Sequence, residues 1–209
     1  MSARTTLATF LAPFTLALLA GCDTATEPLA PAEESDPIET IDPALTALPG
    51  VTGTASGGGN FDAGVDVSFA FGVVQFNDFH ALGVFRFHTI LGGELVDFTG
   101  RATCLTIDRE NDRAWIGGVV TKNRSTHPSF TQPINDVGRD IWFRVVDYGH
   151  GRRATQPDRT TFVGFEGGAG IITSLEYCET QPWPGPPEDV EDARTNALTR
   201  GNLLVWARR

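Results

Sequence analysis

One glycine-hinged loop holds the side chains that are best suited to chemistry. The segment DYGHGRR contains Asp147, His150, Arg152 and Arg153. An imidazole and a carboxylate can transfer protons, and guanidinium groups bind anions. We therefore identify these four residues as a candidate ligand or anion loop. A polar connection between two strands explains the same composition, and we prefer it because no serine motif such as GxSxG accompanies the loop.

The other titratable side chains do not form a metal-binding or cofactor-binding motif. The sequence has four histidines, and none is spaced from another histidine or a cysteine as zinc ligands are. Asp108, Glu110 and Asp112 alternate as in a calcium loop, but its glycine and distal glutamate are missing. The glycine run at residues 57–59 is not followed by Lys-Ser or Lys-Thr, as a phosphate loop requires. We expect no metal and no cofactor.

Cys22 ends the motif Leu-Ala-Gly-Cys, which follows an apolar stretch over residues 7–20. That stretch is short for a membrane span and contains Pro13, so a cleaved signal peptide is the better interpretation. The motif resembles the lipobox of bacterial lipoproteins, in which the cysteine sulfur is diacylated. The resemblance implies a signal peptide at residues 1–21 and a lipid on Cys22, which binds the chain to a bilayer of the cell envelope. It leaves inner and outer membrane open, and an ordinary signal peptide with an incidental cysteine is the alternative.

The other two cysteines, Cys104 and Cys178, form an even remainder once Cys22 is assigned to the lipid. In an exported protein such a remainder predicts a disulfide bond. A reactive thiol pair is the alternative, but the two residues lack CxxC spacing and a nearby histidine. We therefore predict a structural bridge between them.

Acidic side chains are concentrated between the predicted lipid site and the folded domain. Residues 22–49 are rich in Pro and Ala and contain no aromatic, Lys or Arg residue, which predicts a disordered tether. Residues 51–209 carry 15 basic and 19 acidic side chains, although the whole chain has a net charge of −10. No basic stripe suited to a phosphate backbone is present, so we expect no nucleic-acid partner.

Residues 50–209 show the period-two alternation of β-strands. In GVFRFH, for example, Phe85 and Phe87 are expected to point inward while Arg86 and His88 point outward. The expected strands cover residues 65–71, 83–88, 95–107 with a bend at Gly100, 114–122, 139–148, 159–166, 169–177 and 201–208. This spacing predicts an all-β fold, an antiparallel meander closed into a small barrel or a tight sandwich.

Several short segments of this domain resemble a family of uncharacterised exported bacterial β-domain lipoproteins and surface proteins. The resemblance covers most of residues 51–209 and implies a β fold outside the cytoplasm, without catalytic residues. Asn60 stands where relatives often have histidine. The segments are GGGNF at residues 57–61, FAF at 69–71, CLTI at 104–107, AWIGGVV at 114–120, FRVVDYG at 143–149, PD at 157–158 and GN at 201–202.

Together these features predict a membrane-anchored envelope lipoprotein with a non-catalytic β domain that has a binding or structural role. A lipocalin-like barrel that holds a small ligand is the alternative, since barrels of about eight strands can enclose one. A hydrolase that uses the loop at residues 147–153 is a third hypothesis, which we rank last. The partner would be the bilayer, together with a protein or small molecule whose identity the sequence leaves open.

Overall fold

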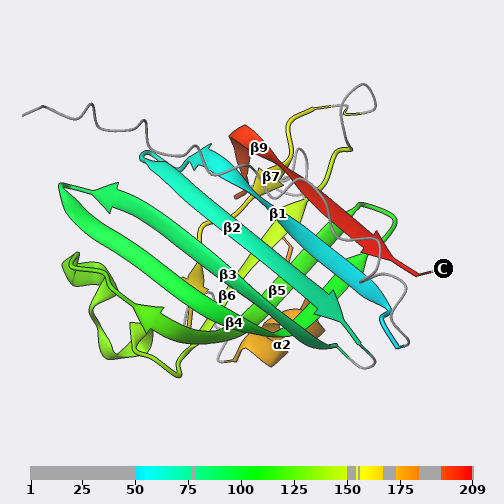
Figure 1. The fold of residues 1–209 in the computed structure, drawn as a ribbon, viewed down its shortest axis with the longest axis horizontal. Helices are drawn as coiled ribbons and strands as arrows, with labels where there is room; N and C mark the ends of the chain where they lie inside the picture. The colour runs from blue at the N-terminus through cyan, green and yellow to red at the C-terminus, as the bar shows by residue number, and fades with distance from the viewer. Residues whose placement is uncertain are drawn as a thin grey trace, which may run out of the picture. The chain divides into compact units, whose positions relative to one another are not determined.

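Eight strands of one antiparallel sheet close on themselves to form a barrel (Figure 1). The computed structural model describes residues 50–76, 79–149, 154, 156–166, 173–183 and 194–208. All of these residues belong to one compact unit. The predicted all-β fold and its closure into a small barrel are confirmed.

The first six strands form a meander in which each strand pairs with the next. β6 also pairs with β7, and β9 pairs with β7 and with β1, which closes the ring. The short β8 lies outside the ring and pairs with β6 alone. The strands are β1 (Gly53–Asp62), β2 (Asp66–Gln75), β3 (His80–Leu91), β4 (Glu94–Asp108), β5 (Arg113–Asn123), β6 (Asp140–Val146), β7 (Arg159–Thr160), β8 (Gly164–Phe165) and β9 (Asn196–Ala207). Two 3-10 turns, η1 (Pro128–Phe130) and η2 (Pro133–Asn135), lie between β5 and β6.

Phenylalanine rings fill the inside of the barrel. Phe143 lies at the centre, with ring centroids 5.3 Å from Phe71, 5.3 Å from Phe85 and 5.0 Å from Phe87. The interior of an eight-stranded barrel is just wide enough for side chains to fill it. Seven phenylalanines of this core are at most 4% exposed: Phe61, Phe69, Phe71, Phe85, Phe87, Phe98 and Phe143. The predicted inward orientation of Phe85 and Phe87 is therefore confirmed.

Glycine allows β1 and β9 to approach each other closely. Gly59 pairs with Gly201, and both have positive φ angles, of 149° and 104°. A Cβ atom on Gly201 would collide with the backbone of Gly58 and Gly59, and one on Gly59 would collide with that of Arg200. The glycine run at residues 57–59 thus provides close backbone approach, as its composition indicates.

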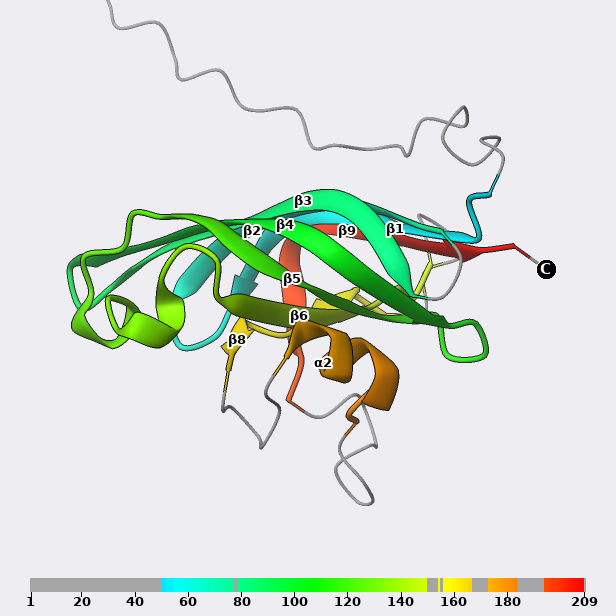
Figure 2. The same ribbon diagram turned by 90° about the horizontal axis from the view of Figure 1, so that it is seen from below.

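A second layer covers the outer side of strands β4 to β6 (Figure 2). It contains α2 (Ser174–Thr180), which begins after Thr173, whose side-chain oxygen accepts a hydrogen bond from the Glu176 N–H at 3.1 Å. The predicted strand at residues 169–177 is therefore wrong from Ser174 onward, because this N-cap and packing against the barrel favour a helix. No helix in the described part of the chain has the length and apolar character that a membrane span needs.

The predicted disulfide between Cys104 and Cys178 is confirmed, and it fixes α2 to β4. The chain-entropy model assigns a loop of this length a stabilisation of about 4 kcal/mol. Beside the bridge, the rings of Trp142 and Tyr177 stack with centroids 5.5 Å apart, and burial raises the pKa of the Tyr177 hydroxyl. This layer explains why both faces of β6 are buried.

Candidate functional site at the barrel seam

The ring closes between β7 and β9 through one of its two shortest stretches of strand pairing, and we call this closure the seam. Only two residue pairs join these strands, Thr160 with Asn196 and Arg159 with Ala197. The Arg159 guanidinium strengthens this corner by donating to the side-chain and backbone oxygens of Thr195, at 2.8 and 2.6 Å. Beyond this corner, the backbone of β9 faces the connection between β6 and β7, which includes the predicted anion loop.

Asp147, the first residue of that loop, is buried and bound to the backbone on both sides of the seam. One carboxylate oxygen accepts the N–H of Gly149 at 2.7 Å, and the other accepts the N–H of Val205 at 2.9 Å. Hydrogen bonds to an ionised carboxylate are about twice as strong as neutral ones. The structure therefore gives Asp147 a structural task in closing the barrel.

Asp158 also binds β9, through Leu203, which lies two residues before the Val205 that Asp147 binds. Its carboxylate accepts the N–H of Tyr148 at 2.8 Å and that of Leu203 at 2.7 Å, and its backbone oxygen accepts the N–H of Leu198 at 2.8 Å. The two aspartates thus take hydrogen bonds that a neighbouring strand would otherwise accept. Sequence reasoning missed the role of Asp158, which had no signal beyond its place in a short Pro-Asp segment.

A hollow of about 180 Å³ lies next to these aspartates. It is lined by Gly149, Ala154, Gln156, Pro157, Asp158 and residues 198–202 of β9. The lining is mainly polar, with amide, carboxylate and backbone groups that can form hydrogen bonds to a small polar ligand. Three residues of the predicted loop, His150, Arg152 and Arg153, lie outside the described residues, so the anion-binding hypothesis rests on the sequence for them.

A larger hollow, of about 390 Å³, lies where the turn between β4 and β5 meets the end of β9. Its lining includes Ile107, Arg109, Asp112, Val205, Trp206 and Ala207. Burial, together with the nearby carboxylates of Asp147 and Asp108, raises the pKa of Asp112. Asp112 also has a φ of 50°, in the left-handed region that aspartate and asparagine tolerate better than most residues. Arg109 and Trp206 in the lining of this hollow suit a small aromatic ligand.

On the outer layer, two arginines pack against the ring of Trp183. The guanidinium carbons of Arg113 and Arg144 lie 3.8 Å and 4.3 Å from its centroid, within the range of cation–π interaction. Arg144 and Trp115 also donate hydrogen bonds to the backbone oxygen of Pro182, at 2.8 and 3.1 Å. These contacts hold the segment after α2 against β5 and β6. No sequence pattern brings the two arginines to Trp183, because these residues are far apart in the chain.

The described part of the chain does not contain a cluster of three or more His, Cys, Asp or Glu side chains placed to hold a metal ion. Asp108 at the β4–β5 turn instead stabilises the turn itself. Asp108 accepts hydrogen bonds from the Glu110 N–H at 3.0 Å and from the Asn111 side-chain amide at 2.6 Å. This is the ordinary chemistry of an Asx turn.

Comparison of the chain with models of protein families, with curated proteins and with solved structures finds no match. Function must therefore be argued from the site and the fold alone.

We predict that Asp158→Asn destabilises the barrel by about 1–3 kcal/mol, because the new amide N–H₂ faces a backbone N–H and leaves it buried without an acceptor. Urea unfolding at neutral pH measures this change in the free energy of unfolding. Asp136→Asn, at an exposed position, is the matched control and should change stability little. Equal effects of the two substitutions would contradict the role assigned to Asp158.

We predict that Asp112→Asn stabilises the protein slightly at neutral pH, by less than about 1 kcal/mol because water screens the site. Since the folded state raises the pKa of Asp112, ionisation there costs stability as pH rises through the unfolded value, 3.8. The advantage of asparagine should therefore be largest at neutral pH. It should vanish in acid, where Asp112 is protonated in both the folded and the unfolded protein. Thermal unfolding across pH measures it, and a gain that persists at pH values below 3.8 would contradict this cause.

Proposed function

We propose that the chain is a lipoprotein of the bacterial cell envelope, held to a bilayer by acylated Cys22, with a non-catalytic barrel that has a binding or structural role. The observation that supports the proposed role of the barrel is its filled interior. Because phenylalanine rings occupy the inside, ligands and partners must contact the outer wall, the loops or the hollows at the ends.

The filled interior argues against the alternative of a lipocalin-like cup. Phe69, Phe71, Phe85 and Phe87 are all buried, and the centroids of neighbouring rings lie 5.0–6.1 Å apart, as in close-packed aromatic clusters. A ligand inside would have to displace several of these rings. Packing of this density leaves few voids larger than a water molecule.

The environment of Asp147 argues against the hydrolase hypothesis. A carboxylate that acts as a general base must be able to reach the proton of a substrate or water. Both oxygens of Asp147 instead accept hydrogen bonds from the backbone, and the side chain is buried at the seam. Removing it would disturb the closure of the barrel as well as any reaction.

The cysteine pattern supports the lipid anchor. Cys104 and Cys178 are joined to each other, so Cys22 is the one cysteine of the chain outside the bridge. It follows the signal-peptide-like stretch and completes the lipobox-like motif. Several acyl chains, each buried methylene contributing about 0.8 kcal/mol, would anchor the domain durably.

We predict that Cys22→Ser moves the protein from the membrane fraction to the soluble fraction, because serine cannot form the thioether that carries the lipid. Fractionation of cells that express the full chain, followed by immunoblotting, measures the distribution. Ser35→Ala, within the tether, is a control that should stay with the membrane. Persistent membrane binding of the Cys22→Ser protein would contradict the anchor.

We also predict that the Cys22→Ser protein shows no saturable binding of a small apolar probe such as benzene, because its interior is full. Phe143→Ala in the same background is the positive control, since an apolar cavity left by a large side chain can bind such a probe. Titration calorimetry or a shift in melting temperature reports binding. Tight binding by the protein with Phe143 intact would favour the ligand-cup alternative instead.

A further inference from the structure

Three apolar side chains near the β2–β3 turn point into solvent, and we call them the hairpin patch. They are Phe79, Leu82 and Val84, which are 36%, 62% and 63% exposed. Leu82 and Val84 lie on the outer face of β3, where strand residues alternate between core and surface. Apolar side chains gathered on a surface in this way mark a contact site more often than isolated ones do.

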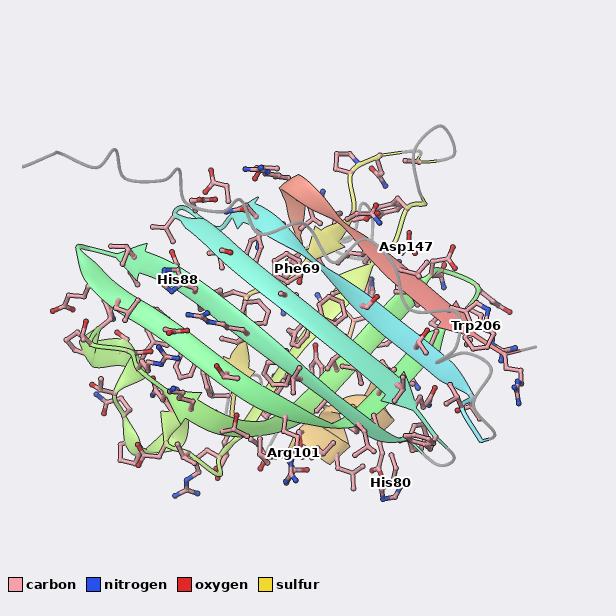
Figure 3. All side chains as sticks on the ribbon, in the orientation of Figure 1. Phe69, His80, His88, Arg101, Asp147 and Trp206 are labelled. Carbon is pink, nitrogen blue, oxygen red and sulfur yellow. A yellow bond between two sulfur atoms is a disulfide. The ribbon has the colours of Figure 1, made fainter. Side chains whose placement is uncertain are left out.

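The neighbours of the hairpin patch on the barrel wall include one exposed cation, Arg101. Leu82 lies opposite Val74 of β2, and Val84 lies between Gly72 of β2 and Arg101 of β4. Gly72 has no side chain that could cover Val84. The side chain of Arg101 is exposed. Figure 3 shows Arg101 along the same edge of the barrel as His80, the first residue of β3. The patch therefore has one exposed cation, Arg101, beside its apolar groups.

The backbone holds Phe79 at the surface in a conformation that is costly for a bulky residue. Its φ angle is 66°, in the left-handed region, where most non-glycine residues are strained. The Phe79 carbonyl accepts the N–H of Leu105 at 3.0 Å, and the N–H of Phe76 donates to the carbonyl of His80 at 2.8 Å. These hydrogen bonds fix the turn. An asparagine or glycine would fit this conformation with less strain. An exposed phenylalanine at this position therefore points to a role for its side chain at the surface.

The described part of the chain begins beside this same turn. The N–H of Thr52 donates to the carbonyl of Gln75 at 2.9 Å, and its hydroxyl donates to the carbonyl of Phe76 at 2.9 Å. Both acceptors lie at the end of β2, directly before the β2–β3 turn. The segment that leads from Cys22 to the barrel therefore joins the barrel next to the hairpin patch.

We infer that the hairpin patch docks on the surface of the bilayer that holds the acylated Cys22, with Arg101 facing anionic headgroups. This inference rests on the lipid anchor proposed above. Residues 23–49 can span at most about 90 Å, and a linker of this kind keeps the barrel near the bilayer at an effective concentration of about a millimolar. Under these conditions a small patch with weak affinity of its own suffices.

Charge favours the patch over the tether as the second membrane contact. Residues 23–49 contain acidic side chains and no Lys or Arg, so anionic lipids repel them. Arg101 at the rim of the patch is attracted instead. The barrel would then sit with its β2–β3 turn towards the bilayer, and the face bearing the seam would be available to other partners.

An environment-sensitive fluorophore on Leu82→Cys tests the docking directly, because the three natural cysteines are acylated or bridged in the lipidated protein. The protein is reconstituted in vesicles that contain phosphatidylglycerol, and vesicle flotation first shows whether it is anchored. We expect blue-shifted emission and several-fold weaker quenching by iodide than in the Cys22→Ser form without vesicles. Ile90→Cys, on the same face of β3 but near its other end, is the matched control and should remain open to iodide.

The outcomes separate docking from anchoring. Protein that does not float with the vesicles contradicts the anchor, whereas protein that floats with a water-exposed probe at position 82 contradicts the docking alone. A probe that is already shielded in the Cys22→Ser form without vesicles would show that a second copy or another part of the chain covers the patch. This result would also contradict docking on the bilayer. The double variant Phe79→Asn/Arg101→Gln should lose the shielding, since asparagine suits the turn and keeps it folded.

Discussion

Two buried carboxylates, those of Asp147 and Asp158, hold the barrel closed where strand pairing runs out. They accept the N–H groups of Val205 and Leu203 on β9, at 2.9 and 2.7 Å, in place of a neighbouring strand. Burying a charge is expensive unless it is hydrogen-bonded, and here each carboxylate accepts two backbone N–H groups. Without these bonds the inner face of β9, including the fully buried Leu203, would be held mainly by β1. The packed interior therefore depends on two polar contacts at its edge.

Because the barrel is closed and its interior is filled, a ligand or partner must bind on the outside of the molecule. The rings around Phe143 leave the interior to packing, and the layer of α2 and Trp183 covers one side of the wall. Among the described residues, the surfaces open to recognition include the hollow beside the seam, the hollow at the end of β9 and the exposed outer wall around Leu82. A rigid module of this kind suits a domain held at a membrane, where position and surface decide which partners it meets.

The sequence predicts the parts of this structure that depend on local pattern. Alternation such as that of Phe85 and Phe87 identifies most strands, and counting cysteines finds the disulfide. It misses β1, because a strand built on the glycines at residues 57–59 has few side chains to alternate. It also misses α2, which is too short for helical periodicity and depends on packing and on the bridge to Cys104. The role of Asp158 is invisible for a similar reason, since its partners on β9 are brought to it only by closure of the barrel.

Exchange of the backbone amide hydrogens of Leu203 and Val205, followed by NMR, tests the closure most directly. The carboxylate contacts predict that both amides are protected to the same degree as those in the paired interior of the sheet, such as that of Phe71. They also predict that the protection of Leu203 falls sharply in the Asp158→Asn protein. Exchange at both amides as fast as at an open strand edge would contradict the account, because β9 would then close the barrel without its aspartates.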